Sequence, residues 1–279
     1  LMDELLWPAH PLGRDIAGTR ESVSDMTREM MMAHVEQFYS PSNIAISIAG
    51  NVEHEEVVTL VESLCRGWSP RRPPACTPFA DAQQAPQLRL EYRKTEQAQV
   101  SIGLPGLSIT HPDRYAVDML SVVLGEGMSS RLFMEVRERQ GLAYDIHSGV
   151  SHFQDCGAFV VDAGIDPKRV DDAVETVLVE VGRLREGVPE EELERAKRLS
   201  TGLLVLRMED TRAVSSWAGS HELLLGHVLD VDEVSRLVEG VTTDDMARVA
   251  NDLLLTEKLN MAVVGPRRAE RRFLRALKL

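Results

Sequence analysis

The chain has 279 residues, of which 43% are hydrophobic and 27% are charged, and its formal net charge is −13. This length allows one large domain or two ordinary ones, while the negative charge argues against nucleic acid as the main partner, because binding phosphates requires a positive surface. Apolar runs such as TGLLVLRM (201–208) are too short to span a bilayer, so no membrane partner is expected. Three cysteines, Cys65, Cys76 and Cys156, lack C-x-x-C spacing and fit neither a disulfide framework nor a thiolate zinc site. We therefore expect a reducing, cytoplasmic location.

The first residues, LMDELLWPAHPLGRD, carry acids and a proline where a signal peptide needs a basic start and an apolar run. Because residue 1 is Leu rather than Met, we expect the chain to be shortened at its N-terminus.

The first elements are predicted between residues 27 and 68. TREMMMAHVEQFYSP (27–41) has apolar residues at helical spacing and predicts an amphipathic helix. NIAISIAG (43–50) alternates Ile with small residues and predicts a strand. EHEEVVTLVESLCRGW (53–68) predicts a second helix, with acids in the first turn where the helix dipole favours them.

A proline-rich stretch follows these elements. Residues 70–86, PRRPPACTPFADAQQAP, contain five prolines and almost no apolar periodicity. Such a composition stiffens the chain and keeps it out of a core. We predict a linker over 70–87 that separates part of a first domain (1–69) from a second domain (88–279).

Beyond the linker, strands and helices alternate, which is typical of an α+β fold. In chain order we predict a strand or strand pair over 88–106, helices over 111–125 and 129–140, and strands over 142–153 and 156–166. The pattern is helical from 167 to about 254, and the chain closes on a strand over 258–265.

One internal match stands out. Thr27 aligns with Thr242, and Gly50 aligns with Gly265, at the same offset of 215 residues, with apolar residues matching in between. This indicates a capped helix followed by a strand ending in Gly, present twice, although any helix–strand unit could match about as well. If the repeat is real, most of the first copy would precede Leu1.

Histidine spacing does not indicate a metal site in this chain. The two histidines of HELLLGH (221–227) are six residues apart, whereas a helical zinc pair needs a spacing of four. His147 and His152 are five apart on a predicted strand and would face opposite sides.

The remaining candidates are Arg137 and Tyr144, in RLFMEVRERQGLAYDIHSG (131–149). This stretch predicts a short helix, stopped by Gly141, that leads directly into a strand. An Arg fork and a phenol at one helix–strand joint could donate hydrogen bonds to a carbonyl oxygen that becomes negative during a reaction. By spacing alone, a solvated Arg and a half-buried Tyr explain the pattern as well.

Three segments, SSRLFMEVRERQGLAYDI, PLGRDIAGTRESV and YSPSNIAISIAGNVEHEEV, together resemble the M16 (pitrilysin/insulinase-like) zinc metallopeptidases. The nearest group is the small bacterial members similar to the mitochondrial processing peptidase. The resemblance implies tandem homologous α+β domains of the mitochondrial-processing-peptidase/LuxS-like metallohydrolase type, the first incomplete here. It also implies a parent zinc endopeptidase that hydrolyses peptides or partly unfolded polypeptides in a chamber.

In that family an H-x-x-E-H helix of the first domain binds zinc, and no such motif occurs in this chain. We therefore expect the chain alone to bind no metal and to be inactive. The resemblance implies that Arg137 and Tyr144 hold the substrate carbonyl from the second domain. It also implies a peptide substrate and pairing as a homodimer or with a sister subunit. The alternative is a non-catalytic peptide-binding or structural partner subunit.

Overall fold

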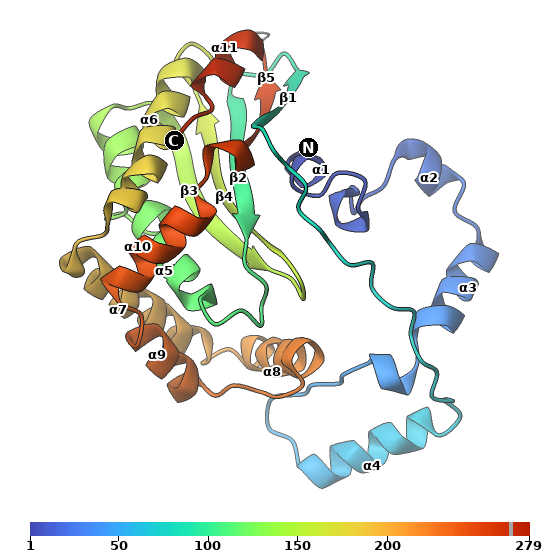
Figure 1. Ribbon diagram of the computed structural model, residues 1–279. Coiled ribbons are helices and arrows are strands. Elements are labelled where there is room, and N and C mark those ends of the chain that lie inside the picture. The colour runs from blue at the N-terminus through green and yellow to red at the C-terminus, as the bar shows by residue number, and fades with distance from the viewer. Residues whose placement is uncertain (268–269) are drawn as a thin grey trace. The chain divides into compact units, whose positions relative to one another are not determined.

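The computed structural model describes residues 1–267 and 270–279, and their contacts divide the chain into two compact units (Figure 1). Unit 1 comprises Leu1–Arg14, Pro78–Thr201 and Ser235–Leu279, and unit 2 comprises Asp15–Thr77 and Gly202–Val234. The domain boundaries drawn from the sequence, with a linker over 70–87, stay a prediction. No helix of the described residues combines the length and apolar character needed to cross a membrane.

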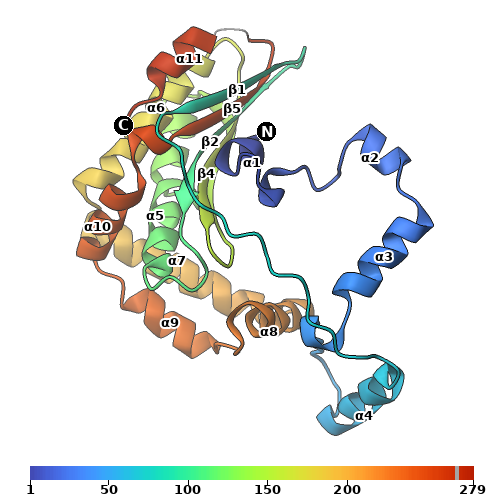
Figure 2. The same ribbon diagram turned by 45° about the vertical axis from the view of Figure 1, so that its right-hand side comes forward.

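Unit 1 is built on a five-stranded sheet with the order β1-β5-β2-β4-β3 (Figure 2). The strands are β1 Gln87–Tyr92, β2 Ala98–Gly106, β3 Ala143–His152, β4 Gly157–Ile165 and β5 Asn260–Gly265. β1 runs parallel to β5, and the other pairings are antiparallel. The segment 88–106 is thus a pair of strands, and these two are not neighbours because β5 lies between them. The predicted α+β class is confirmed.

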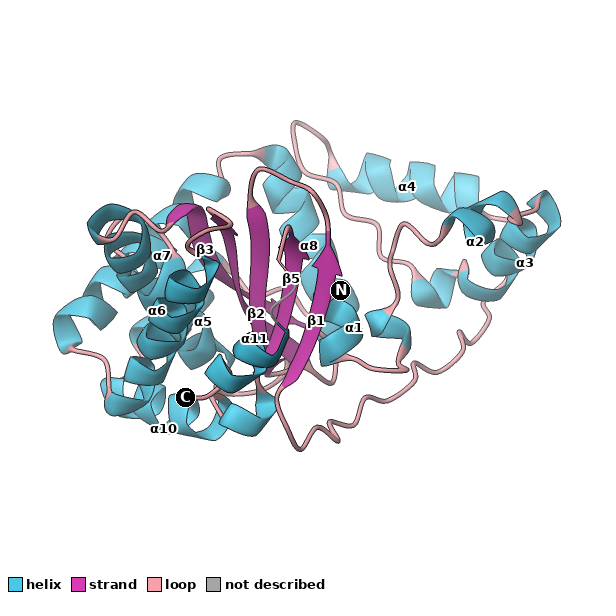
Figure 3. Ribbon diagram, turned by 90° about the horizontal axis from the view of Figure 1, so that it is seen from above, coloured by secondary structure: helices cyan, strands magenta, loops and turns pink. Residues whose placement is uncertain are grey.

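Helices cover one face of this sheet (Figure 3). They are α5 Arg114–Gly125, α6 Val170–Arg183, α10 Thr243–Leu253 and α11 Glu270–Ala276, while α7 Glu190–Arg207 and α9 Val231–Glu239 have residues in both units. Alternate strand residues such as Ile102, Leu104 and Met261 are at most 2% exposed. The period of two along each strand sends these side chains into one apolar core, whose burial is the main stabilising contribution.

Helix α1 Met2–Leu6 packs on the opposite face of the sheet, against β1, β2 and β5 (Figure 2). Gly103 makes this close approach possible, because a Cβ atom there would lie 2.5 Å from the Met2 sulfur. Leu6 and Trp7 are 5% and 4% exposed, so the first residues belong to the core of unit 1.

The prediction that the chain closes on a strand is wrong, because α11 follows β5. Phe273 and Leu277, four residues apart, are 1% and 3% exposed. Arginines surround these two apolar positions in the sequence. The amphipathic pattern is therefore too short to be recognised from periodicity.

Unit 2 contains helices that bury little apolar surface. They are α2 Arg20–Ser24, α3 Arg28–Phe38, α4 His54–Cys65 and α8 Thr211–Leu225, and none of them has a buried residue. Polar contacts connect them to the segments between. The Ser215 hydroxyl donates to the Ser47 carbonyl at 2.7 Å, and Arg71 Nη1 donates to the Glu36 carbonyl at 2.8 Å.

The predicted strand over 43–50 is not formed. Ile44 has extended backbone angles of −131° and 130°, but residues 44–49 form no strand. Ile46 and Ile48 are 57% and 52% exposed. A strand requires a hydrogen-bonded neighbour, and no strand of the described residues pairs with this segment.

The internal repeat is visible in the structure at the predicted offset. Helix α3 corresponds to α10, and the 3₁₀ turn Pro41–Asn43 corresponds to the turn Thr256–Lys258, residue for residue. The side chains of Thr27 and Thr242 both cap their helices by accepting a hydrogen bond from the backbone N–H three residues on. The two copies then differ, because the second continues into β5 and the first into an unpaired segment.

Candidate functional site

The joint between the predicted helix over 129–140 and β3 is held by buried apolar residues and by wide backbone turns. The segment Phe133–Arg139 is a π-helix, so the predicted helix is present with different hydrogen bonding. The Leu142 N–H donates to the Val136 carbonyl at 2.8 Å, and the Gly141 N–H donates to the Arg137 carbonyl at 3.2 Å. Gly141 has a φ of +59°, a conformation that Gly adopts without strain. The chain thereby passes from the helix, which ends at Arg139, to β3, which begins at Ala143.

Arg137 projects from this π-helix into solvent. Its guanidinium carbon lies 5.0 Å from the centroid of the Phe133 ring, a cation–π distance. No carboxylate of the described residues pairs with it. The other two arginines of the segment are paired, Arg131 with Glu192 at 2.8 Å and Arg139 with Glu135 at 2.9 Å.

Tyr144 lies at a β-bulge. The register of β3 against β4 shifts between Ala143 and Asp145, which leaves Tyr144 without a directly opposite partner. Its side chain is 62% exposed. Bulges commonly redirect a side chain at the end of a strand. The structure therefore brings Arg137 and Tyr144 to one joint, both accessible, and records no hydrogen bond between their described side chains.

Charged residues lie on β3 and β4 next to this bulge. His147 Nδ1 is 3.6 Å from an Asp145 carboxylate oxygen, and both side chains are more than half exposed. His147 is also directly opposite Asp162 of β4. The two acids give this part of the sheet a negative character.

His152, on the same strand, has a structural role. Its Nδ1 is 2.7 Å from the Leu107 carbonyl oxygen and its Nε2 is 3.1 Å from an Asp118 carboxylate oxygen. Burial lowers the pKa of His152, but the hydrogen bond and charge of Asp118, together with the Leu107 carbonyl, outweigh burial and raise the pKa above its usual value. The ring donates to both acceptors only when it carries both protons.

The two histidines of HELLLGH lie at the C-terminal end of α8 and make local contacts there. His221 of α8 accepts a hydrogen bond from the Leu229 N–H at 3.3 Å, and its ring centroid lies 4.2 Å from that of Trp217, with the two rings tilted by 57°. His227 follows Gly226, which ends α8 in the left-handed conformation. Within residues 1–267 and 270–279, no group of three or more His, Cys, Asp or Glu side chains is placed to hold a metal.

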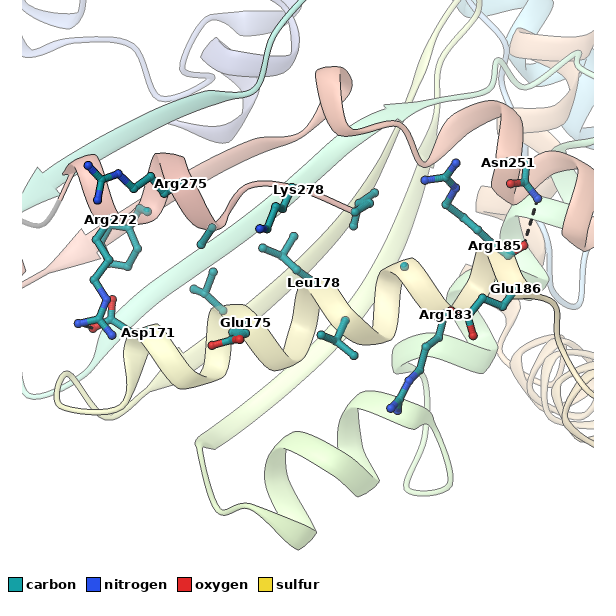
Figure 4. Close-up of a pocket in the computed structure, with 16 residues that line it drawn as sticks. Asp171, Glu175, Leu178, Arg183, Arg185, Glu186, Asn251, Arg272, Arg275 and Lys278 are labelled. Carbon is teal, nitrogen blue, oxygen red and sulfur yellow. Dashed lines mark hydrogen bonds and ion pairs between the residues drawn. The ribbon is translucent and has the colours of Figure 1, made fainter.

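A cavity of about 810 Å³ lies between α6 and the C-terminal α11 (Figure 4). Leu178 of α6 is among its apolar lining residues. Several of its polar lining residues bind one another. Asp171 binds Arg272 at 3.2 Å, and Asn251 donates to the Arg185 carbonyl at 3.1 Å. Neither Arg137 nor Tyr144 lines this cavity, and we assign it no role in catalysis.

Sequence reasoning missed Phe133 and the bulge at Tyr144. The spacing of four between Phe133 and Arg137 could have indicated the stacked pair, because residues four apart are neighbours on a helix. The bulge leaves no comparable pattern in the sequence.

Comparison with known proteins places the chain in a family. Residues 25–200, which include Arg137 and Tyr144, match the family model described as the peptidase M16 inactive domain. An uncharacterized zinc protease of Streptomyces coelicolor is 37% identical over 262 residues, which cover 91% of this chain and 57% of that protein. The chain thus spans less than two thirds of the length of this relative.

Solved structures show the same fold. A protease from Helicobacter pylori matches with a TM-score of 0.84 at 19% identity, over 95% of this chain and 65% of that one. A chain of complex III from Candida albicans matches with a TM-score of 0.86, also at 19% identity, over 100% of this chain and 69% of that one. With more than half of its residues matched by the family model, the chain belongs to the M16 peptidase family.

Proposed function

We propose that this chain is the substrate-clasping part of a zinc-dependent endopeptidase that hydrolyses peptides or partly unfolded polypeptides in an enclosed chamber. Membership of the M16 family and a relative named a zinc protease support the proposal. The described residues do not fit a zinc site, so in this proposal zinc is held by a part of the peptidase outside residues 1–279. The chain alone is then inactive.

The role of this chain is to bind the carbonyl group of the peptide bond that is cleaved. Arg137 offers five N–H donors and Tyr144 one O–H donor. Donors aimed at the carbonyl oxygen stabilise it most when it gains negative charge, which lowers the barrier rather than only improving binding. The observation that carries the proposal is that Arg137, unlike Arg131 and Arg139, has no carboxylate partner among the described residues and keeps its donors available.

Strand β3 provides a surface on which a peptide can align. It is an edge strand, so its outer N–H and C=O groups face no other strand of the described residues. An extended peptide can add to such an edge through main-chain hydrogen bonds. A peptide bound there would run past Tyr144, at the start of the strand.

The test uses the complete peptidase, with this chain and its zinc-binding part together. Arg137→Ala and Tyr144→Phe should each lower kcat by about 100-fold or more, the usual cost of losing an oxyanion donor. Arg139→Ala is the matched control on the same helix, because Arg139 pairs with Glu135. Turnover unchanged by both substitutions would overturn the roles assigned to these residues.

The alternative is a non-catalytic, peptide-binding or structural partner subunit of an M16-type assembly. The same fold occurs in a chain of complex III from Candida albicans, so the fold does not decide between the two functions. Metal analysis of the complete protein separates them. About one zinc per protein with peptide hydrolysis supports the peptidase, and peptide binding without zinc supports the partner subunit. Either function is compatible with a homodimer or a sister subunit, which mass measurement in solution would establish.

A further inference from the structure

The three arginines of the segment 131–139 have different partners. Arg131 and Arg139 are bound by carboxylates of Glu192 and Glu135, whereas Arg137 is contacted by the ring of Phe133. A carboxylate partner occupies two of the guanidinium N–H groups when it binds side-on. An aromatic ring attracts the cation through its electron-rich face and has no lone pair that uses a donor.

We propose that Phe133 is a positioning residue for Arg137, which orients the guanidinium while leaving its N–H donors free for a substrate carbonyl. This inference rests on the function proposed above. An exposed arginine otherwise samples many rotamers. Fixing one rotamer when the substrate binds costs conformational entropy and so lowers affinity. Stacking on Phe133 removes part of that freedom before the substrate arrives.

The backbone around Phe133 is suited to this role. Leu132 and Val136, the neighbours of Phe133 and Arg137 on the helix, are fully buried and anchor it. Phe133 itself is only half-buried, so its ring remains beside the exposed Arg137 instead of packing inside the core. π-Helical segments are rare and occur frequently at functional sites.

The experiment compares three substitutions in the complete peptidase. Phe133→Leu removes the ring and keeps an apolar side chain, and kcat/KM should fall about two- to fivefold, as expected for an exposed cation–π contact. Phe133→Trp retains an aromatic face and should keep the activity. Phe133→Glu places a carboxylate four residues before Arg137, which would orient the guanidinium but occupy its donors, so activity should fall further than in Phe133→Leu.

The decisive measurement is a double-mutant cycle with Arg137→Ala. If Phe133 acts through Arg137, Phe133→Leu has no further effect once Arg137 is removed. Met134→Ala, at an exposed apolar position of the same helix, is the matched control and should leave kcat/KM unchanged.

The outcomes separate this inference from the function on which it rests. If Arg137→Ala has no effect, the role proposed for Arg137 as a donor to the substrate carbonyl fails. If Arg137→Ala lowers activity but Phe133→Leu does not, or if the two losses simply add, only the positioning role of Phe133 is overturned. Loss of activity in Phe133→Trp equal to that in Phe133→Leu would also overturn it.

Discussion

The two copies of the internal repeat, residues 27–50 and 242–265, form the same local structure but have different surroundings. Both begin with a threonine-capped helix and continue through a 3₁₀ turn. In the second copy Met261 and Val263 are fully buried in the sheet, whereas their counterparts Ile46 and Ile48 are 57% and 52% exposed. The helix and turn therefore follow from nearby residues, while the strand depends on neighbours far away in the sequence.

The two copies also differ in how their helices are stabilised. Helix α10 buries Met246, Val249 and Ala250, whereas α3 has no buried residue. Isolated helices of this length are marginal in water, and most helical stability comes from packing. We therefore expect the first copy to open more readily than the second.

The largest expected effect comes from shortening matched apolar residues in the two copies. Met261→Ala should lower the free energy of unfolding by about 2–5 kcal/mol, because it leaves a cavity in the core. Ile46→Ala should change it by about 0.5 kcal/mol or less, since the side chain is largely exposed. Urea denaturation, with amide exchange in β2 as the probe of unit 1, measures both. Equal losses at the two positions would contradict the comparison.

The titration of His152 reports on unit 1, because this side chain links β3 to Asp118 of α5. The pKa of His152 is raised in the folded protein, so its contribution to stability is complete below the unfolded pKa of about 6.5. That contribution is lost as pH rises through the folded pKa. The loss should not exceed about 1.5–3 kcal/mol, the usual worth of a hydrogen bond to a charged group.

NMR titration of His152 gives its folded pKa, and denaturation at several pH values gives the stability. His152→Gln is the control and should remove this part of the pH dependence. A folded pKa at or below the usual histidine value would show that burial outweighs Asp118.

The smallest expected effect comes from the matched caps. Thr242→Ala and Thr27→Ala should each weaken their helix by about 1 kcal/mol. Because α10 is packed in the core, the first substitution should lower the global stability of unit 1. The second should only speed amide exchange within α3. A global effect of Thr27→Ala would mean that the first copy is more tightly coupled to the core than its exposure indicates.

The elements that local residues determine were predictable from the sequence. The helix now defined as α5 and the strands β3 and β4 follow from apolar periodicity and turn residues. The position of β5 between β1 and β2 was not predictable, because strand order depends on contacts between distant residues. The strand predicted over 43–50 is not formed, because it too would need a partner strand from a distant part of the sequence.

The candidate site was predictable only through resemblance to a family. Spacing alone left Arg137 and Tyr144 equally well explained as surface residues. The structure adds a bulge at Tyr144 and an aromatic ring beside Arg137. The spacing of Phe133 and Arg137 is visible in the sequence, whereas the bulge depends on pairing between β3 and β4 that no short motif encodes.

The place of β5 in the sheet has a consequence for synthesis on the ribosome. β2 pairs with β5 along one side, yet β5 is made about 150 residues after β2. At a translation rate of roughly 5–20 residues per second, that side of β2 stays unpaired for about 8–30 s. During this time β1 cannot join the sheet, and helix α1 lacks part of the surface it covers. The nascent chain therefore exposes one edge of β2 and the apolar side chains of α1 until β5 emerges.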